Sequence, residues 1–387
     1  MNVYKAYKFR MYPNDIQKSK LNSFLGSSRF IYNYYLNKKD KLYKENSINY
    51  SIGNMKKDLK ELIKEYKWLK DIDSNILRTS LDDLDRSYNN FYNKRSNYPK
   101  YKKKNNQDTY RTNAIRSSYK GNNYCNIKVD LDKKTIKLPK LEEIKIKGYR
   151  KLKTFNDKKI ISVTVSKEAN RYYASILLEE EIRKLEYKLH TSIGLDLGIK
   201  NLIVTSDGVK YKKMEKLEKY EKKIKGLNKA LSRSKRGSKN REKIKIKIQR
   251  VYQKLRNIRK YYSHKITNKI VKENDLIVSE TLDIKEMIAH SHKNLRKKIL
   301  HSTFNEIIRQ IEYKSRWQSK KYIKIDKYYA SSQICSHCLE KEKKVKDLNV
   351  REWECKKCHN KNDRDINASI NILMKGIEKY YKEEYVY

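Results

Sequence analysis

The chain has 387 residues, of which 94 are lysine or arginine and 46 are aspartate or glutamate, so its formal net charge is +48. Self-repulsion at this charge disfavours a compact state, which argues against most enzymes of small neutral molecules and favours a polyanion as partner. The length predicts two or three domains, and no stretch approaches the roughly 20 apolar residues of a membrane helix, so we expect no membrane partner.

The first predicted elements are a strand over residues 3–11 and then a long helical region. Asn14 or Asp15 can cap the first helix of this region. We expect Gly26 to interrupt that helix. A helix-turn-helix over residues 15–40 is an alternative interpretation of the same segment.

From about residue 126 the apolar residues alternate with polar ones, which is the period of a strand. The alternation predicts strands over residues 127–131, 136–138, 161–165 and 173–177. In the last segment the alternating set is Tyr173, Ser175 and Leu177. Together these segments predict a small antiparallel sheet or barrel.

The third region mixes strands and helices. Strands are expected at residues 193–198, 202–204, 276–280 and 322–326, and helices at 304–317 and from about 364. Residues 210–260 hold 22 lysine and arginine residues against four acids, with apolar residues at helical intervals. We interpret this basic segment as a helical hairpin that bends near residues 234–238.

Four of the five cysteines form two Cys-x-x-Cys pairs, Cys335 with Cys338 and Cys355 with Cys358, separated by sixteen residues. Each turn can place two thiolates on one metal ion, and two turns complete a tetrahedral structural zinc site. The alternatives are unligated thiols or redox pairs, although the βαβ pattern beside thioredoxin-like pairs is absent. We therefore expect one structural Zn²⁺. The isolated Cys125 is expected to be a small, buried apolar residue.

Acidic residues stand at the ends of the later strands. Asp196 lies inside an apolar strand, where an ionised carboxylate is costly unless it meets a cation. Glu280 ends another apolar strand, and Asp363 and Asp365 precede the last helix. Each acid also has a structural alternative. Asp363 could be a helix N-cap and Glu280 a surface charge at the end of a strand, and all of them could form ion pairs.

Together the acids form a pattern that is typical of an RNase H-like fold: a strand with Asp, a hairpin, a later parallel strand with Glu and a final helix with Asp. Three carboxylates on adjacent elements could hold two Mg²⁺ ions about 4 Å apart. Such ions activate water and stabilise the leaving oxygen in phosphodiester hydrolysis.

The segments that carry these acids resemble the motifs of the transposon-encoded TnpB (OrfB) nucleases. Residues 193–198, Ile-Gly-Leu-Asp-Leu-Gly, are similar to the first RuvC motif of that family. Residues 277–282 are similar to the second motif and residues 363–369 to the third, with the zinc ribbon between them. Leu339 and His359 depart from the family, because glycines usually follow the zinc knuckles there.

The resemblance implies that Asp196, Glu280 and Asp365 are the catalytic residues and the ligands of two Mg²⁺ ions. Members of this family are RNA-guided DNA endonucleases, ancestors of the type V CRISPR effectors. The implied partners are a guide RNA from the transposon end and double-stranded target DNA next to a short target-adjacent motif. The implied location is the prokaryotic cytoplasm, at the nucleoid. A guided DNA-binding repressor without cleavage and a transposase acting directly on element ends are the alternatives.

The implied fold class is multidomain α+β. Its expected parts are a wedge-like antiparallel β-barrel (residues 1–12 and 120–190), a helical recognition domain (13–119), an RNase H-like RuvC α/β nuclease domain (191–332 and 359–387) and a zinc-ribbon insert (333–358).

Two basic segments are the predicted nucleic-acid-binding residues, because lysine and arginine neutralise phosphates without reading sequence. They are Lys100, Lys102, Lys103 and Lys104 in the first segment, and Lys235, Arg236, Lys239 and Arg241 in the second. Interleaved tyrosines can stack on unpaired bases or pack against an apolar surface: Tyr88, Tyr92, Tyr98, Tyr101 and Tyr110.

Overall fold

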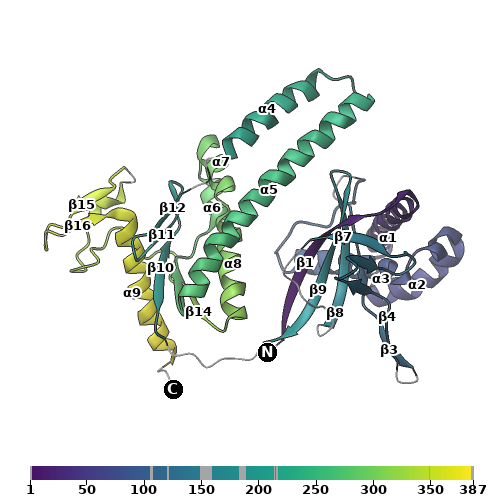
Figure 1. Ribbon diagram of the computed structural model, residues 1–387, viewed down its shortest axis with the longest axis horizontal. Coiled ribbons are helices and arrows are strands. Elements are labelled where there is room, and N and C mark those ends of the chain that lie inside the picture. Colours follow the sequence, from purple (N-terminus) through teal and green to yellow (C-terminus); the bar gives the residue numbers. More distant parts are fainter. Residues whose placement is uncertain are drawn as a thin grey trace. The chain divides into compact units, whose positions relative to one another are not determined.

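The structure is a computed structural model with two compact units, Met1–Ile182 and Arg183–Tyr387 (Figure 1). It describes residues 2–104, 108–119, 122–148, 159–182, 189–212, 214, 217–347 and 349–384. None of the helices in this part of the chain is both long enough and apolar enough to span a membrane.

The first unit combines a curled antiparallel sheet with three α-helices (Figure 1). The sheet runs in the order β2-β8-β9-β1-β7-β6-β5, so among the described strands it is an open half-barrel with β2 and β5 at its edges. The strands are β1 (Asn2–Tyr12), β2 (Thr109–Asn113), β5 (Lys128–Asp130), β6 (Thr135–Lys137), β7 (Ile144–Lys147), β8 (Lys159–Glu168) and β9 (Arg171–Glu181), with a separate hairpin of β3 (Arg116–Tyr119) and β4 (Asn122–Cys125). The helices are α1 (Asp15–Asn46), α2 (Ile52–Glu65) and α3 (Ser74–Tyr92), with a 3₁₀ turn η1 (Lys67–Asp71).

Helix α1 begins as predicted but does not break where predicted. Asn14 caps it, because its side chain accepts the N–H of Gln17, whose side chain in turn accepts the N–H of Asn14. The helix then continues through Gly26, so the predicted interruption is wrong, and so is the alternative helix-turn-helix. An interior glycine costs a helix about 1 kcal/mol, which the burial of the neighbouring Leu21 and Tyr35 offsets.

Strand β9 shows that alternation predicts a strand better than it predicts which face is buried. The side chains that face the core are Tyr172, Ala174, Ile176 and Leu178. The set containing Tyr173, which the alternation had singled out, lies on the half-exposed face. A one-residue change of phase exchanges the two faces of a strand, and both faces of β9 carry apolar residues.

One hydrophobic core joins the helices and the sheet of the first unit. Residues of β1, α1, α2, α3, β8 and β9 belong to the same buried cluster, and Cys125 packs against it while remaining partly exposed. The helical segment and the sheet therefore stabilise each other.

The second unit contains a five-stranded sheet in the order β12-β11-β10-β13-β14. Its strands are β10 (Ser192–Asp196), β11 (Asn201–Thr205), β12 (Lys210–Lys212), β13 (Leu276–Ser279) and β14 (Lys321–Lys324). The first three form an antiparallel meander, while β13 is parallel to both β10 and β14. This is the order that the sequence predicts for an RNase H-like sheet.

Helices cover both faces of this sheet (Figure 1). The helices in the described part of this unit are α4 (Leu217–Arg233), α5 (Lys239–Glu273), α6 (Ile284–Ala289), α7 (Lys293–Ser302), α8 (Phe304–Trp317) and α9 (Arg364–Glu384). The end of α5 and α8 share a core with one face, and α9 packs on the other. Two glycines permit the close approach of α9: a Cβ at Gly194 would lie 2.0 Å from the carbonyl oxygen of Ser369, and one at Gly376 would lie 2.3 Å from Val278.

The predicted basic hairpin is confirmed as α4 and α5, joined near residues 234–238. Ser238 caps α5 by accepting the N–H of Arg241. Ile224, Val251 and Leu255 form a small separate core between the two helices. Between β14 and α9 lie the 3₁₀ turn η2 (Lys343–Lys346) and the hairpin of β15 (Glu352–Glu354) and β16 (Lys361–Asp363).

Candidate active site and metal centre

The two Cys-x-x-Cys turns have the same backbone geometry. The N–H of Leu339 donates to the carbonyl of Cys335 at 2.9 Å, and the N–H of His359 donates to that of Cys355 at 2.9 Å. Leu339 and His359 have φ values of 63° and 56°, in the left-handed region. These residues therefore adopt the turn that glycine usually supplies, at a cost of about 1 kcal/mol each.

The turns bring four thiols together. All four Sγ atoms lie within 4.8 Å of one another, with Cys335 to Cys358 at 3.6 Å and Cys338 to Cys355 at 3.5 Å. Sulfurs bound to one zinc ion by bonds of about 2.3 Å are roughly 3.8 Å apart, whereas a disulfide needs about 2.05 Å. The cluster therefore fits one structural Zn²⁺, held by these four cysteines. Asn362 donates to Cys335 Sγ at 3.8 Å, as a side chain around a metal thiolate does.

Helix α9 is hydrogen-bonded directly to the first of these turns. Asn367 accepts the N–H of Ser336 at 2.9 Å and donates to the carbonyl of Ile334 at 2.7 Å. One turn later Asn371 donates to the carbonyls of Ile334 and Ser331. Both asparagines are almost fully buried, so the cysteine cluster and the start of α9 form one rigid part.

Two of the predicted catalytic acids lie side by side at the carboxyl ends of parallel strands. Asp196 is the last residue of β10, and Glu280 follows β13 directly. The strands are paired in register up to Leu195 and Ser279, the residues before the two acids. Asp365 comes from the first turn of α9, which packs across β10 and β13. The fold thus brings all three acids to one edge of the sheet.

The electrostatics of this cluster favour a cation. Burial raises the pKa of Asp196 well above its ordinary value, and the negative charges of Glu280 and Asp365 raise it further. Burial also raises the pKa of Glu280 to about 7, although a hydrogen bond from the N–H of Leu197 opposes this shift. Clustered carboxylate oxygens that destabilise one another's charge are the donor set that hard divalent cations prefer.

The carboxylate oxygens are not gathered around one point as the four thiol sulfurs are. Within the described part of the chain, the four cysteines are the one group of metal-ligating side chains drawn tightly around a single point. A site for two ions about 4 Å apart requires a wider set of oxygens than a site for one. The donor types therefore fit divalent metal ions.

Two arginines that sequence reasoning missed approach the acids. The guanidinium of Arg351 lies 3.3 Å from the carboxylate of Asp365. Arg364 is buried and donates to the carbonyls of Asp347 and Val350, and both arginines lower the pKa of Asp196. Arg364 adjoins Asp365 within the third motif, which is a sequence signal for it, whereas Arg351 is brought to Asp365 by the fold.

Asp363 has the structural role expected of it. Its carboxylate accepts the N–H groups of Asp365 at 3.1 Å and Ile366 at 3.0 Å, which is the geometry of an N-cap of α9. Its other oxygen pairs with Lys210 at 2.6 Å. Burial raises its pKa, but the bond from Lys210 and these N–H groups outweigh burial and hold the pKa below its ordinary value.

The first predicted basic segment has a mixed environment. Lys100, Lys103 and Lys104 are exposed. Lys102 instead lies with its ammonium 3.9 Å from the centre of the Tyr32 ring, and its backbone N–H donates to Asn33. Burial lowers the pKa of Lys102.

The second basic segment lies at the bend between α4 and α5. Lys235, Arg236 and Lys239 are exposed. The guanidinium of Arg241 donates to the carbonyls of Leu231 and Ser234, at the end of α4. Arg241 therefore helps to close the hairpin, which leaves the other three as the open cations of this segment.

The tyrosines also divide. Tyr88 and Tyr110 are buried in the core of the first unit, whereas Tyr92, Tyr98 and Tyr101 are exposed. Tyr88 and Tyr98 both donate to Asp40. Packing therefore accounts for Tyr88 and Tyr110, while Tyr92 and Tyr98 combine exposure with ring contacts to Tyr88.

Three family models match different parts of this chain. A model described as "Probable transposase" of the OrfB_IS605 family covers residues 175–291, and a Cas12f1-like TNB domain covers residues 304–372, including the four cysteines. A model described as "Helix-turn-helix domain" of the same OrfB family covers residues 1–47. In this structure that last segment contains strand β1 and the single helix α1.

Over nearly its whole length the chain is similar to "Putative RNA-guided DNA endonuclease InsQ" of Escherichia coli (strain K12). The two are 30% identical over 97% of this chain and 93% of the relative. The chain belongs to the TnpB (OrfB) family. Another relative, "Putative RNA-guided DNA endonuclease" of Streptomyces pristinaespiralis, is 29% identical over 97% of this chain and 90% of its own length.

A solved structure places this TnpB-family chain among known folds. The protein in the cryo-EM structure of the Cas12f1-sgRNA-target DNA complex superposes with a TM-score of 0.57, covering 96% of this chain and 98% of that one at 12% identity. At this identity the likeness concerns the fold. It agrees with the mixed α+β architecture.

Proposed function

We propose that this protein is an RNA-guided DNA endonuclease of an insertion sequence, which hydrolyses DNA phosphodiester bonds next to a short target-adjacent motif. The observation that carries the proposal is the meeting of Asp196, Glu280 and Asp365 at one edge of an RNase H-like sheet. The names of the relatives with 30% and 29% identity support the same reaction and the same use of a guide.

The three carboxylates would hold two Mg²⁺ ions. Such ions supply an activated water molecule and stabilise charge on the leaving oxygen. The chain itself fixes where these charges are placed. The paired strands set Asp196 beside Glu280, the N-cap at Asp363 fixes the first turn of α9, and the bonds from Asn367 hold that turn against the zinc-binding part. Arg351 balances the charge of Asp365.

The guide RNA and the double-stranded target DNA would bind through the basic surfaces. We assign phosphate contacts to the predicted cations, Lys100, Lys102, Lys103, Lys104, Lys235, Arg236, Lys239 and Arg241, with the exposed members as the principal ones. Because base pairing between the guide RNA and the target would read the sequence, the protein needs to contact only the sugar-phosphate backbones. We propose the same wedge-like, recognition, nuclease and zinc-ribbon domains, except that β2 (Thr109–Asn113) pairs with β8 and is therefore assigned to the wedge-like sheet. The protein would act at the nucleoid.

To test this, the protein is co-expressed with the DNA that forms the end of its insertion sequence. The protein is then purified, and the RNA that co-purifies is sequenced. We expect one stable RNA species, and Mg²⁺-dependent cleavage of a plasmid that matches the variable end of this RNA. RNase treatment before the target is added should abolish this cleavage. Cleavage that persists after RNase would favour a transposase acting directly on DNA, and binding without cleavage would favour a guided repressor.

A further inference from the structure

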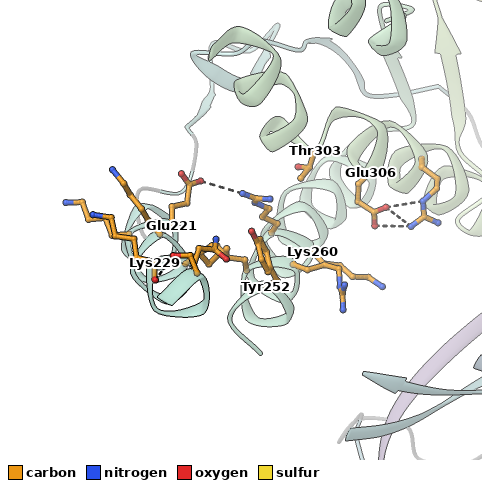
Figure 2. Close-up of a pocket in the computed structure, with 15 residues that line it drawn as sticks. Glu221, Lys229, Tyr252, Lys260, Thr303 and Glu306 are labelled. Carbon is orange, nitrogen blue, oxygen red and sulfur yellow. Dashed lines mark hydrogen bonds and ion pairs between the residues drawn. The ribbon is translucent and has the colours of Figure 1, made fainter. Parts of the chain in front are cut away.

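A large groove lies on the basic hairpin of the second unit, between α4, α5 and the start of α8 (Figure 2). Its volume is about 1310 Å³. Pockets for small molecules usually enclose about 300–1,000 Å³, so this groove suits a segment of a polymer. The three candidate catalytic acids do not line it, and the nuclease chemistry leaves it unexplained.

The α4 side of the groove is basic and open. Lys222, Lys225 and Lys229 recur along one face of the helix, and all three are exposed. Within the described part of the chain none of them forms an ion pair with an acid. Three cations in a row, seven residues from first to last, match the requirements of a phosphate backbone better than those of a neutral ligand.

The acids in the groove do not offset this charge. Glu221 pairs with Arg259 at 3.8 Å, and Glu306 pairs with Arg309 at 2.9 Å (Figure 2). Each acid is thus matched by an arginine of the same groove. The lysines of α4 and Lys260 of α5 remain as the excess positive charge.

The α5 side offers an aromatic surface. Tyr252 lines the groove and is 51% exposed, while the neighbouring Leu255 is buried in the hairpin core. Figure 2 shows Tyr252 projecting from α5 on the side of the groove opposite Lys229 of α4. An exposed ring between rows of cations is the arrangement that stacks an unpaired base and neutralises its phosphates.

A neutral polar side chain of the groove has the donor and acceptor groups that a ribose hydroxyl can pair with. Asn228 is exposed in the groove, between Lys225 and Lys229. An amide can donate to and accept from a ribose 2′-hydroxyl, which RNA has and DNA lacks. The bases of duplex DNA are stacked inside the helix, whereas RNA loops present unpaired bases to aromatic side chains.

We propose that this groove binds an unpaired segment of the guide RNA, with one base stacked on Tyr252 and its phosphates on Lys225 and Lys229. The inference rests on the proposed RNA-guided function and assigns part of the guide to a defined surface of the nuclease unit. The stacked base fixes the RNA at one point, and the lysines contribute affinity that does not depend on sequence.

Photo-crosslinking of the whole complex tests this. The chain is expressed with its RNA in cells supplied with 4-thiouridine, irradiated, and digested for mass spectrometry of the crosslinked peptides. We expect crosslinks within residues 221–260. Tyr252→Ala should reduce them at least about fivefold, because a stacked base contributes a corresponding share of affinity. Tyr261→Ala is the matched control, since Tyr261 is 69% exposed on the same helix and lies outside the groove.

A charge-reversal pair provides an independent measurement. The double variant Lys225→Glu with Lys229→Glu should release the co-purified RNA at lower salt than the wild type does. The control, Lys243→Glu with Lys247→Glu, changes the net charge equally at exposed lysines of α5 outside the groove. Equal salt sensitivity of the two double variants would contradict the proposal.

The outcomes separate the two proposals. If RNA co-purifies but its crosslinks are the same in Tyr252→Ala and Tyr261→Ala, the groove assignment is wrong and the RNA-guided function stands. If 4-thiothymidine in target DNA crosslinks to the groove and the RNA does not, the groove binds single-stranded DNA instead. If the wild type carries no RNA, the proposed function fails, and the groove assignment fails with it.

Discussion

The four cysteines come from two short turns within residues 335–358, whereas the three carboxylates come from two strands and a helix spread over residues 196–365. Each cysteine turn is closed by its own backbone hydrogen bonds. The carboxylates have no such local support, and they meet only because β10, β13 and α9 pack together.

The cysteine cluster and the acid cluster also differ in how ready they are to hold a metal ion. The thiols already stand at distances that suit one ion, which is typical of a closed structural site. Burial and the charges of Glu280 and Asp365 raise the pKa of Asp196, and burial raises the pKa of Glu280. Buried carboxylates with raised pKa values are typical of functional sites. The cysteine cluster thus has the geometry of a site that stabilises the fold, while the acid cluster carries an electrostatic cost that a divalent cation would offset.

The largest effect should come from removing one acid. We expect Asp196→Ala to lower target cleavage about a thousandfold or more, since a metal ion contributes several kcal/mol to the transition state. Target binding should persist, because base pairing and phosphate contacts supply it. Cleavage and binding are measured on the same labelled duplex.

Asp363→Ala is the matched control for the acids. It removes the N-cap of α9, which costs about 1 kcal/mol of stability, and should leave most of the cleavage activity intact. An inactive Asp363→Ala beside an active Asp365→Ala would show that the third acid is misassigned. Cleavage by Asp196→Ala would contradict the nuclease site itself.

The second effect concerns the metal that stabilises the fold. Cys355→Ser should lose its zinc, because a structural site depends on all four thiolates and supplies on the order of 10 kcal/mol. Since Asn367 ties this part to α9, cleavage should be lost as well. Metal analysis and cleavage assays of the same preparation are the measurements. One zinc per chain together with full cleavage would contradict the assignment.

The link between the two sites should have an intermediate effect. Asn367→Ala removes both bonds to the first turn and leaves buried polar groups unpaired, at a cost of about 1–3 kcal/mol. We expect zinc to remain bound while cleavage falls about tenfold, because the first turn of α9 carries Asp365. Asn371→Ala is the control, one turn further from the acid. Equal losses of cleavage in both variants would mean that the two asparagines affect only stability.

The smallest effect should be a pH dependence of stability without magnesium. The pKa of Glu280 is raised to about 7 from an ordinary value of 4.5. Between pH 4.5 and pH 7 the folded protein keeps the proton on Glu280, whereas the unfolded chain has lost it. The contribution of Glu280 to the free energy of unfolding is therefore fully present below about pH 4.5 and is lost as the pH rises through 7. Glu280→Gln cannot ionise and should raise the melting temperature at pH 8 by about 2–4 °C, with little change at pH 5.

Magnesium provides the control for this prediction. Mg²⁺ should raise the melting temperature of the wild type at pH 8, because the ion offsets the negative charge of the ionised Glu280 carboxylate. The melting temperature of Glu280→Gln, which lacks that charge, should be nearly unchanged. Thermal unfolding monitored with and without Mg²⁺ measures both effects. A lower melting temperature of Glu280→Gln at both pH values would mean that the charged carboxylate stabilises the fold.

The sequence was most informative where chemistry is local. Cys-x-x-Cys spacing, the N-cap at Asn14, the hairpin around residues 234–238 and the order of the nuclease strands all follow from short-range patterns. The candidate acids followed from a single anomaly, a carboxylate at Asp196 in an apolar strand, together with the motif resemblance. The structure independently separates Asp363 from Asp365, because the cap uses the carboxylate of Asp363.

Other predictions failed because local patterns compete with packing. Gly26 is a helix breaker by propensity, yet α1 passes through it since buried neighbours on both sides hold the helix together. The buried face of β9 could not be inferred because both faces carry apolar residues. At Gly26 the burial of apolar neighbours outweighs a local helix preference of about 1 kcal/mol.

By itself the sequence determined the charge, the zinc-type ligand set and the order of strands and helices, because these depend on residue identity and short spacing. Only the tertiary structure brought Arg351 to Asp365, tied Asn367 to the first cysteine turn and placed Tyr252 opposite the lysines of α4. Residues far apart in a chain meet when sheet pairing and helix packing fix their distances, and no local pattern encodes those contacts.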